Sequence, residues 1–333
     1  MSPRELVVRT LEFDCPSRLP RQLWLLPWAA QRYPEKAAEL VRRFPDDIIA
    51  TPQLYKTPLP IRGTRYEPGT YVDEWGCVFM NLADGIIGEV KNPLLSDWSK
   101  LDDIRIPVER LTVDADAVRT FCRGTDRFVI AGVVPRIFER LQFLRGSENL
   151  FCDLAQQPPE LHVLIHRIHQ FYLKELEVWA RTGVDALEIM DDWGGQRAML
   201  ISPALWRSMF KPLYREYVEL AHRHGKYFFM HSDGYILDIM PDLVEVGVDA
   251  INAQVFCMGL EQVGAACAGR ITFWGEMDRQ HLLPRGTQDD IRLAAAQMKK
   301  SLYRDGGLIA QCEFGPGANP DNVWTFFEAC EDA

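Results

Sequence analysis

Two side chains that can bind a metal or move a proton stand at the end of an apolar run. The stretch 226–236, KYFFMHSDGYI, has four bulky apolar residues and then continues with His231, Ser232 and Asp233. Because residues two apart in a strand point to the same face, His231 and Asp233 share a face with Phe229. An imidazole and a carboxylate are typical metal ligands and typical acid–base groups. The sequence therefore predicts a reactive site where this strand ends.

Three further apolar stretches, at residues 186–193, 250–255 and 271–278, also carry polar side chains on one face. By the same alternation, the side chains expected to point inward with His231 are those of Glu188, Asp192, Asn252, Gln254, Trp274 and Glu276. A buried charge without a partner costs several kcal/mol, so such a gathering needs a metal, a proton or a substrate. We expect catalytic roles for Glu188, Asp192 and Glu276, and substrate contacts from Asn252, Gln254, Trp193 and Trp274. Asp191 is expected only to cap the turn that follows it.

The elements that must position these residues alternate between short strands and amphipathic helices. Strand candidates lie at residues 46–52, 127–134, 186–193, 226–233, 250–255, 271–278 and 308–314. Helix starts are marked by Ser202-Pro203, by Thr287 with Asp290 and by Asn319-Pro320, and Pro212 is expected to split a helix. Regular alternation predicts βαβ units. No GxGxxG follows the first strand, so a single (β/α)8 barrel domain over residues 1–333 is favoured over a doubly wound sheet.

One segment, at residues 62–90, breaks this alternation. Asp84-Gly85 stands between apolar flanks there, which predicts a β-hairpin turn. We expect this hairpin to be an insertion over or beside the mouth of the barrel, without extending the barrel itself. In (β/α)8 enzymes the active site lies at the mouth formed by the carboxyl ends of the strands.

The overall composition narrows the class of protein. The chain has 333 residues, of which 47% are hydrophobic, and its formal net charge is −10, which argues against general nucleic-acid binding. It has no apolar stretch of the roughly 20 residues that a membrane helix needs. The opening MSPRELVVRTLEF has Ser2, Pro3 and Glu5 where a helix start places them, and it does not resemble a signal peptide. Eight cysteines without a CxxC pair indicate reduced thiols, and we expect a cytoplasmic enzyme.

A metal site can be considered on residue types alone. His231, Cys312 and one carboxylate would suit zinc, which accepts nitrogen, sulfur and oxygen ligands. However, Cys312 shares its strand face with Leu308 and Ala310, and by itself it is better explained as a buried apolar thiol.

The chain resembles the uroporphyrinogen decarboxylase superfamily from Ser2 to about Glu328. The stretches that carry the resemblance are DALEIMDDWGGQRAMLISPALWRSMFKPLY, HGKYFFMHSDGYILDIMPDLVEVGVDAIN and LIAQCEFGPGANPDNV. In addition, DEWGCVFMNLADGIIGEV is similar to the hairpin of the superfamily's methyltransferase branch. That branch includes methylcobalamin:coenzyme M methyltransferases and corrinoid-dependent demethylases. The resemblance implies a (β/α)8 barrel that moves a methyl group between a small ether, amine or thiol and a corrinoid cofactor, possibly carried by a partner protein.

The resemblance also implies a zinc site. The zinc methyltransferases of the superfamily carry His-x-Cys and a distant cysteine. Here His231 matches the histidine, Asp233 replaces the first cysteine, and Cys312, ten residues before Asn322, matches the last one. The expected ligands are therefore His231, Asp233 and Cys312.

Two other functions stay open. Uroporphyrinogen decarboxylases carry an Arg-Gln-Ala-Gly-Arg motif, of which RQLWLLP keeps Arg21-Gln22 and lacks the second arginine. The segment FPDDI brings Asp47 near the place of their catalytic aspartate, so a carboxy-lyase that uses Asp47 is one alternative. A non-catalytic small-molecule binder is the other, and in each case a homodimer is possible. The missing arginine leads us to expect no decarboxylation of a porphyrinogen.

Overall fold

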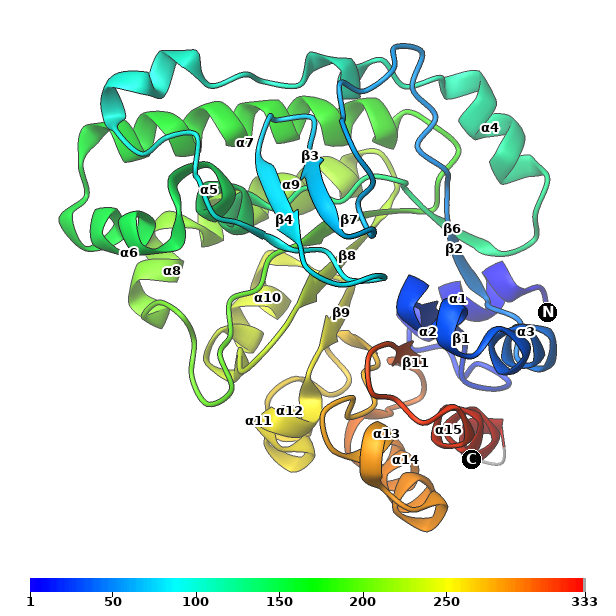
Figure 1. Cartoon of the computed structure of the whole chain (residues 1–333). Helices are drawn as coiled ribbons and strands as arrows, with labels where there is room; N and C mark the ends of the chain where they lie inside the picture. The colour runs from blue at the N-terminus through cyan, green and yellow to red at the C-terminus, as the bar shows by residue number, and fades with distance from the viewer. Residues whose placement is uncertain (332–333) are drawn as a thin grey trace.

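The computed structural model describes residues 1–331, and its centre is a parallel sheet of eight strands. The strands are β1 (Arg21–Leu25), β2 (Ile48–Ala50), β6 (Phe128–Ile130), β7 (Ala186–Met190), β8 (Tyr227–Ser232), β9 (Ala250–Ala253), β10 (Thr272–Trp274) and β11 (Leu308–Phe314). They pair in the order β1-β11-β10-β9-β8-β7-β6-β2. The two end strands approach each other, since the Asp47 amide donates to the Arg21 carbonyl at 2.9 Å. The sheet is thus nearly closed into the predicted (β/α)8 barrel (Figure 1).

Helices surround this sheet. They are α1 (Pro3–Leu11), α2 (Pro27–Arg32), α3 (Pro34–Arg43), α4 (Ala115–Arg123), α5 (Ile137–Arg145), α6 (Ser147–Gln156), α7 (Pro159–Ala180), α8 (Pro203–Met209), α9 (Lys211–Arg223), α10 (Met240–Val246), α11 (Val255–Met258), α12 (Leu260–Cys267), α13 (Leu282–Arg285), α14 (Gln288–Leu302) and α15 (Pro320–Glu331). The predicted capping boxes form at Ser2 with Glu5 and at Thr287 with Asp290. Pro212 separates α8 from α9, as expected. Within residues 1–331, no helix is both long and apolar enough to span a bilayer.

Apolar side chains fill two separate regions, one on each face of the barrel sheet. Outside, between strands and helices, lies the larger cluster, and the alternate residues Phe228 and Met230 of β8 belong to it. Inside the barrel, Phe229 packs with Trp274, and Val7 and Leu11 of α1 cover the amino end. The amino end is therefore closed by an apolar helix, which leaves the carboxyl end of the strands as the open mouth.

The inserted segment forms a small antiparallel sheet of β3 (Gly69–Val72), β4 (Val78–Asn81) and β5 (Glu89–Val90). Asp84-Gly85 lies in the β4–β5 connection, as predicted. A Cβ on Gly85 would stand 2.5 Å from the backbone nitrogen of Trp28, so this turn packs directly on α2. Since α2 follows the carboxyl end of β1, the insertion lies beside the barrel mouth and adds no barrel strand. The predicted position of the hairpin is confirmed.

Candidate active site

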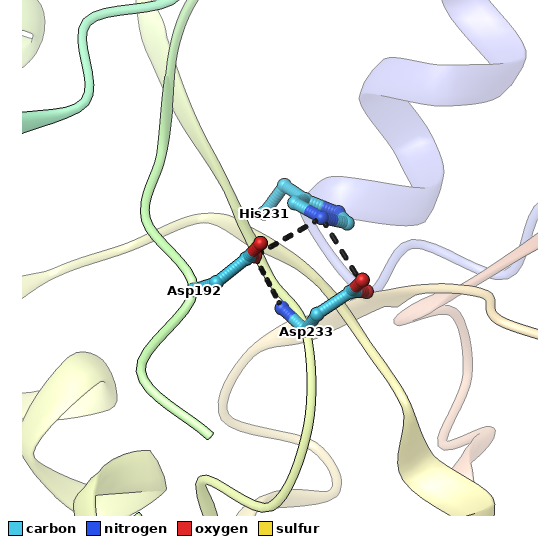
Figure 2. A group of neighbouring side chains, drawn as sticks. All are labelled: Asp192, His231 and Asp233. Carbon is cyan, nitrogen blue, oxygen red and sulfur yellow. Dashed lines mark hydrogen bonds and ion pairs between the residues drawn. The ribbon is translucent and has the colours of Figure 1, made fainter. Parts of the chain in front are cut away.

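Three of the candidate residues meet at the carboxyl-end mouth. His231 lies near the end of β8, Asp233 follows that strand directly, and Asp192 follows β7 (Figure 2). The Nε2 atom of His231 is 3.6 Å from Asp192 Oδ1 and 3.5 Å from Asp233 Oδ1. The three ligand atoms all lie within 4.8 Å of one another, and no other group of this kind occurs in the described residues. The two carboxylates are partly exposed and the imidazole is buried.

Asn252 fixes the orientation and the tautomer of this imidazole. The Asn252 Nδ2 group donates to the Trp274 carbonyl at 2.5 Å, which leaves its Oδ1 facing His231 Nδ1 at 2.6 Å. The proton of the neutral ring therefore sits on Nδ1. The lone pair of Nε2 then points to the two aspartates. This is how a metal-binding histidine is held by a residue behind it.

The two carboxylates differ in their partners. Asp192 Oδ1 accepts the Asp233 backbone N–H at 2.9 Å. Asp233 Oδ2 contacts Arg279, whereas its Oδ1 is buried and has no hydrogen-bond partner within residues 1–331. A buried oxygen without a donor is costly. A cation between Asp233, Asp192 and His231, either a proton on Nε2 or a divalent metal, would satisfy it.

Arg279 holds three carboxylates together on one side of this group. It contacts Asp233, its Nε is 3.2 Å from Glu276 Oε1, and its Nη1 is 2.9 Å from Glu313 Oε1. Burial lowers the pKa of Arg279, but the three carboxylates outweigh this and hold it above its usual value. Glu276 lies just after β10 and is 2% exposed, and burial raises its pKa to about 8.

Glu188 and Glu139 supply further acidic groups on the other side. Glu188 of β7 points into the barrel, where burial raises its pKa to about 8 against the opposing charge of Arg136. Arg136 pairs with Glu139 at 3.4 Å. Burial raises the pKa of Glu139 as well, and the charge of Asp192 adds to the effect. Arg136 and Glu139 line a cleft of about 550 Å³ between the mouth and the inserted sheet, which is large enough for a small organic substrate.

Asp191 has a structural role, but it caps the start of α5 and not, as had been expected, the turn that follows it. Its carboxylate accepts three backbone N–H groups at the start of α5, from Ile137, Phe138 and Glu139 at 2.8–3.1 Å. Tyr214 donates a further hydrogen bond at 2.8 Å. Asp191 thus anchors the loop that carries Asp192 into the mouth.

The structure does not bring Cys312 to the group, so the expected ligand set needs correction. One face of β11 points to the helices and packs into the larger apolar cluster. The residues on this face are Leu308, Ala310, Cys312 and Phe314. Ile309 lies on the opposite face of the strand and points into the barrel. Burial raises the pKa of the Cys312 thiol well above its usual value, which disfavours the thiolate that a metal requires. Asp192 takes the place in the group that Cys312 was expected to fill.

The catalytic expectation for Asp47 is also overturned. Asp47 precedes β2 and so lies at the amino end of the barrel, opposite the mouth. Both of its oxygens are paired with the Arg18 guanidinium at 2.7 Å. Its carboxylate therefore holds two chain segments together where the barrel closes.

The tryptophans and amides proposed as substrate contacts separate into two groups. Trp193 is fully buried, stacks on Phe138 at 4.2 Å and donates to Tyr214, so it packs behind the sheet. Trp274 is buried inside the barrel and donates to Gln22 at 2.8 Å. The side-chain oxygen and nitrogen of Asn252 are already hydrogen-bonded to His231 and to the Trp274 carbonyl. Of the four, Gln254 lines a cavity at the mouth.

Several residues at the mouth were missed by sequence reasoning. Arg279 lies one position beyond the predicted strand 271–278. It was missed because a single arginine in a loop follows no helix or strand periodicity. Glu313 could have been found, because alternation along β11 places it on the inner face opposite Cys312. Trp24, whose ring centroid is 5.4 Å from that of His231, lies on a strand that was not predicted.

Most of the chain matches a known protein family. The sequence model described as uroporphyrinogen decarboxylase (URO-D) matches residues 73–333. The chain belongs to the URO-D family. A uroporphyrinogen decarboxylase of Xanthomonas campestris pv. campestris is 27% identical over 187 residues, which are 52% of this chain and 50% of the relative. One from Coxiella burnetii is 21% identical over 272 residues, which are 77% of this chain and 72% of the relative. The match to the Xanthomonas URO-D relatives thus spans about half of their length.

A solved structure shares the fold of this URO-D family member. A methyltransferase from Methanosarcina mazei superposes with a TM-score of 0.68 over 100% of this chain and 99% of its own. The two sequences are 13% identical, so the likeness establishes the barrel architecture and leaves the activity to be argued from the site.

Proposed function

We propose that this URO-D family member is an enzyme that transfers a methyl group to or from a small substrate, with a divalent metal held by Asp192, His231 and Asp233. The observation that carries the proposal is the Nε2 lone pair of His231, which faces two carboxylates at the barrel mouth. A metal bound there would polarise the heteroatom of the substrate. Zinc is the expected ion, since it accepts imidazole and carboxylate and keeps a position open with three protein ligands.

The ligand atoms of the proposed metal site favour one class of substrate. Two carboxylates in place of thiolates make the ligand set harder. The proposal therefore favours a substrate whose methyl group is carried by oxygen or nitrogen over one whose methyl group is carried by sulfur. Glu188 and Glu276, whose pKa values are raised to about 8, could exchange a proton with such a substrate near neutral pH.

The methyl carrier in this proposal is a corrinoid, borne by a partner protein that meets the open mouth. This part rests on the resemblance of the sequence to the methyltransferase branch. Asn252 orients His231, and Arg279 offsets part of the negative charge of Asp233. The chain's own residues thus prepare a site for a heteroatom next to the approaching carrier.

The test uses zinc-loaded protein with methylcobalamin and a panel of methyl acceptors, namely alcohols, amines and thiols. We expect the cobalamin absorption spectrum to show demethylation with wild type and with Cys312→Ala, and no reaction with His231→Ala. If wild type binds zinc and still leaves methylcobalamin unchanged with every acceptor, the proposed activity is wrong.

The family match and the curated relatives favour one second candidate, decarboxylation of a porphyrinogen. A porphyrinogen carries many carboxylates, which need free arginines at the site. Here Arg21 lies at the amino end of the barrel and pairs with Glu331 at 2.6 Å, and Arg18 is held by Asp47. We therefore expect no conversion of uroporphyrinogen to coproporphyrinogen, which chromatography of the reaction products would check.

A further inference from the structure

A cavity opens at the mouth on the Arg279 side of Asp233. It lies between the segments that follow β9 and β10, and its walls include Gln254, Cys257, Glu276, Met277 and Arg279. Since Arg279 contacts Asp233, the cavity adjoins the group formed by Asp192, His231 and Asp233. A substrate held there would reach the proposed metal.

Glu276 is the unusual feature of this cavity. Its side chain is 2% exposed, and neither carboxylate oxygen makes a hydrogen bond within the described part of the chain. Its one close partner is Arg279 Nε at 3.2 Å. Asp191 shows the contrast, because that equally buried carboxylate receives three backbone N–H groups and a tyrosine hydroxyl. Glu276 is thus a buried acceptor that lines a cavity, and among the described residues only the ion pair with Arg279 satisfies it in part.

The charged residues around the cavity determine whether it favours a positive or a negative ligand. Three carboxylates, those of Asp233, Glu276 and Glu313, surround the single guanidinium of Arg279. Each of its three nitrogens faces one of them, so Arg279 offers no free edge to an anion. Asp278 Oδ1 accepts the backbone N–H groups of Gln280 and His281, and its Oδ2 is 3.3 Å from His281 Nδ1. Asp233 and Glu313 outnumber Arg279 even while Glu276 holds a proton, so negative charge is in excess around the cavity. A cation bound beside Glu276 would in turn favour the ionised form of this carboxyl group.

We propose that this cavity is a subsite for a small organic cation, a protonated or quaternary amine whose charged nitrogen lies against Glu276. The inference rests on the proposed function and deepens it, because it names a cationic amine as the methyl donor. The C–N bond would break with its electron pair left on nitrogen while the methyl group passes to the carrier, and the neutral amine that leaves has the lone pair that the metal would bind. Phe256 and Met277 give the cavity apolar surface for the alkyl groups of such a cation. Gln254 adds an amide that can bind a polar substituent. A carboxylate attracts the positive charge of an alkylammonium group, and apolar walls bury its alkyl carbons.

The test is a calorimetric titration of the full-length, zinc-loaded protein. The probes are methylammonium, tetramethylammonium and choline, with 3,3-dimethylbutan-1-ol as the uncharged isostere of choline. We expect at least one cation to bind with one site per chain. We expect Glu276→Gln to weaken its binding at least tenfold. Glu261→Gln, which removes one exposed charge on α12, is the matched control and should bind like wild type.

The outcomes separate the subsite from the catalytic proposal. If none of the three cations binds wild type, or if the uncharged isostere binds as tightly as choline, the subsite is refuted without any variant. Equal binding by Glu276→Gln, shown by thermal unfolding to be folded, refutes it as well. Cation binding that survives in a protein unable to hold zinc or transfer methyl groups upholds the subsite and overturns the proposed function. Methyl transfer by a protein that binds none of the cations upholds the proposed function and refutes the subsite.

Discussion

Replacing Glu188 by glutamine should change how the stability of the protein depends on pH. Glu188 lies inside the barrel and is 8% exposed. Burial raises its pKa from 4.5 to about 8, and Arg136 offsets only part of this effect. In the folded protein the carboxyl group therefore stays protonated through neutral pH, whereas in the unfolded chain it ionises.

The size of the effect follows from the two pKa values. Between pH 4.5 and pH 8 the folded state holds one proton that the unfolded state has released. The free energy of unfolding therefore falls as pH rises, by at most about 1.4 kcal/mol per pH unit. Over this interval the ceiling is about 5 kcal/mol. Water in the barrel would reduce it, and we expect at least about 2 kcal/mol between pH 5 and pH 8.

Urea unfolding at pH 5, 6, 7 and 8 measures this directly. Glu188→Gln should gain stability relative to wild type as pH rises, and the gain should shrink toward pH 5. The slope contributed by Glu276 is present in both proteins and cancels in the comparison. Glu219→Gln, an exposed residue of α9, is the control and should follow wild type. If the two stability curves stay parallel, Glu188 is ionised or solvated in the folded state and the reasoning is refuted.

Three further substitutions test other parts of the structure. Asn252→Ala frees the imidazole of His231, and we expect zinc affinity measured by equilibrium dialysis to fall about 10- to 100-fold; unchanged affinity would contradict the role of Asn252. Asp47→Asn weakens the bond to Arg18 and should lower the free energy of unfolding by about 1–3 kcal/mol, with zinc affinity intact; loss of zinc binding would return Asp47 to the site. Cys312→Ala should cost about 1 kcal/mol of stability and keep full zinc stoichiometry, which metal analysis would check.

Strand alternation predicted much of this architecture because the apolar residues follow it closely. Phe228 and Met230 face the helices while Phe229 and His231 face the barrel, as the sequence indicates. The same rule would have kept Cys312 on the helix side with Leu308 and Ala310. The resemblance to zinc enzymes led instead to the expectation that Cys312 binds metal. Local residue patterning was the better guide here, since one residue of register turns a side chain to the other face.

Other features could not be predicted because they depend on contacts between distant segments. The strand β1 was missed, as its five residues RQLWL mix polar and apolar positions and its pairing partner β11 is almost 300 residues away. Arg279 is a loop residue whose role appears only once Asp233, Glu276 and Glu313 surround it. The place of Asp192 in the group depends on Asp191 anchoring its loop to α5.

The most direct measurement is anomalous X-ray diffraction at the zinc edge, from crystals of the zinc-loaded protein. We expect one peak, about 2.0–2.2 Å from His231 Nε2 and from one oxygen each of Asp192 and Asp233. Crystals of His231→Ala should lack this peak, and those of Cys312→Ala should retain it. A peak beside Cys312, or no peak among the three residues in zinc-saturated crystals, would contradict the metal site on which the proposed function depends.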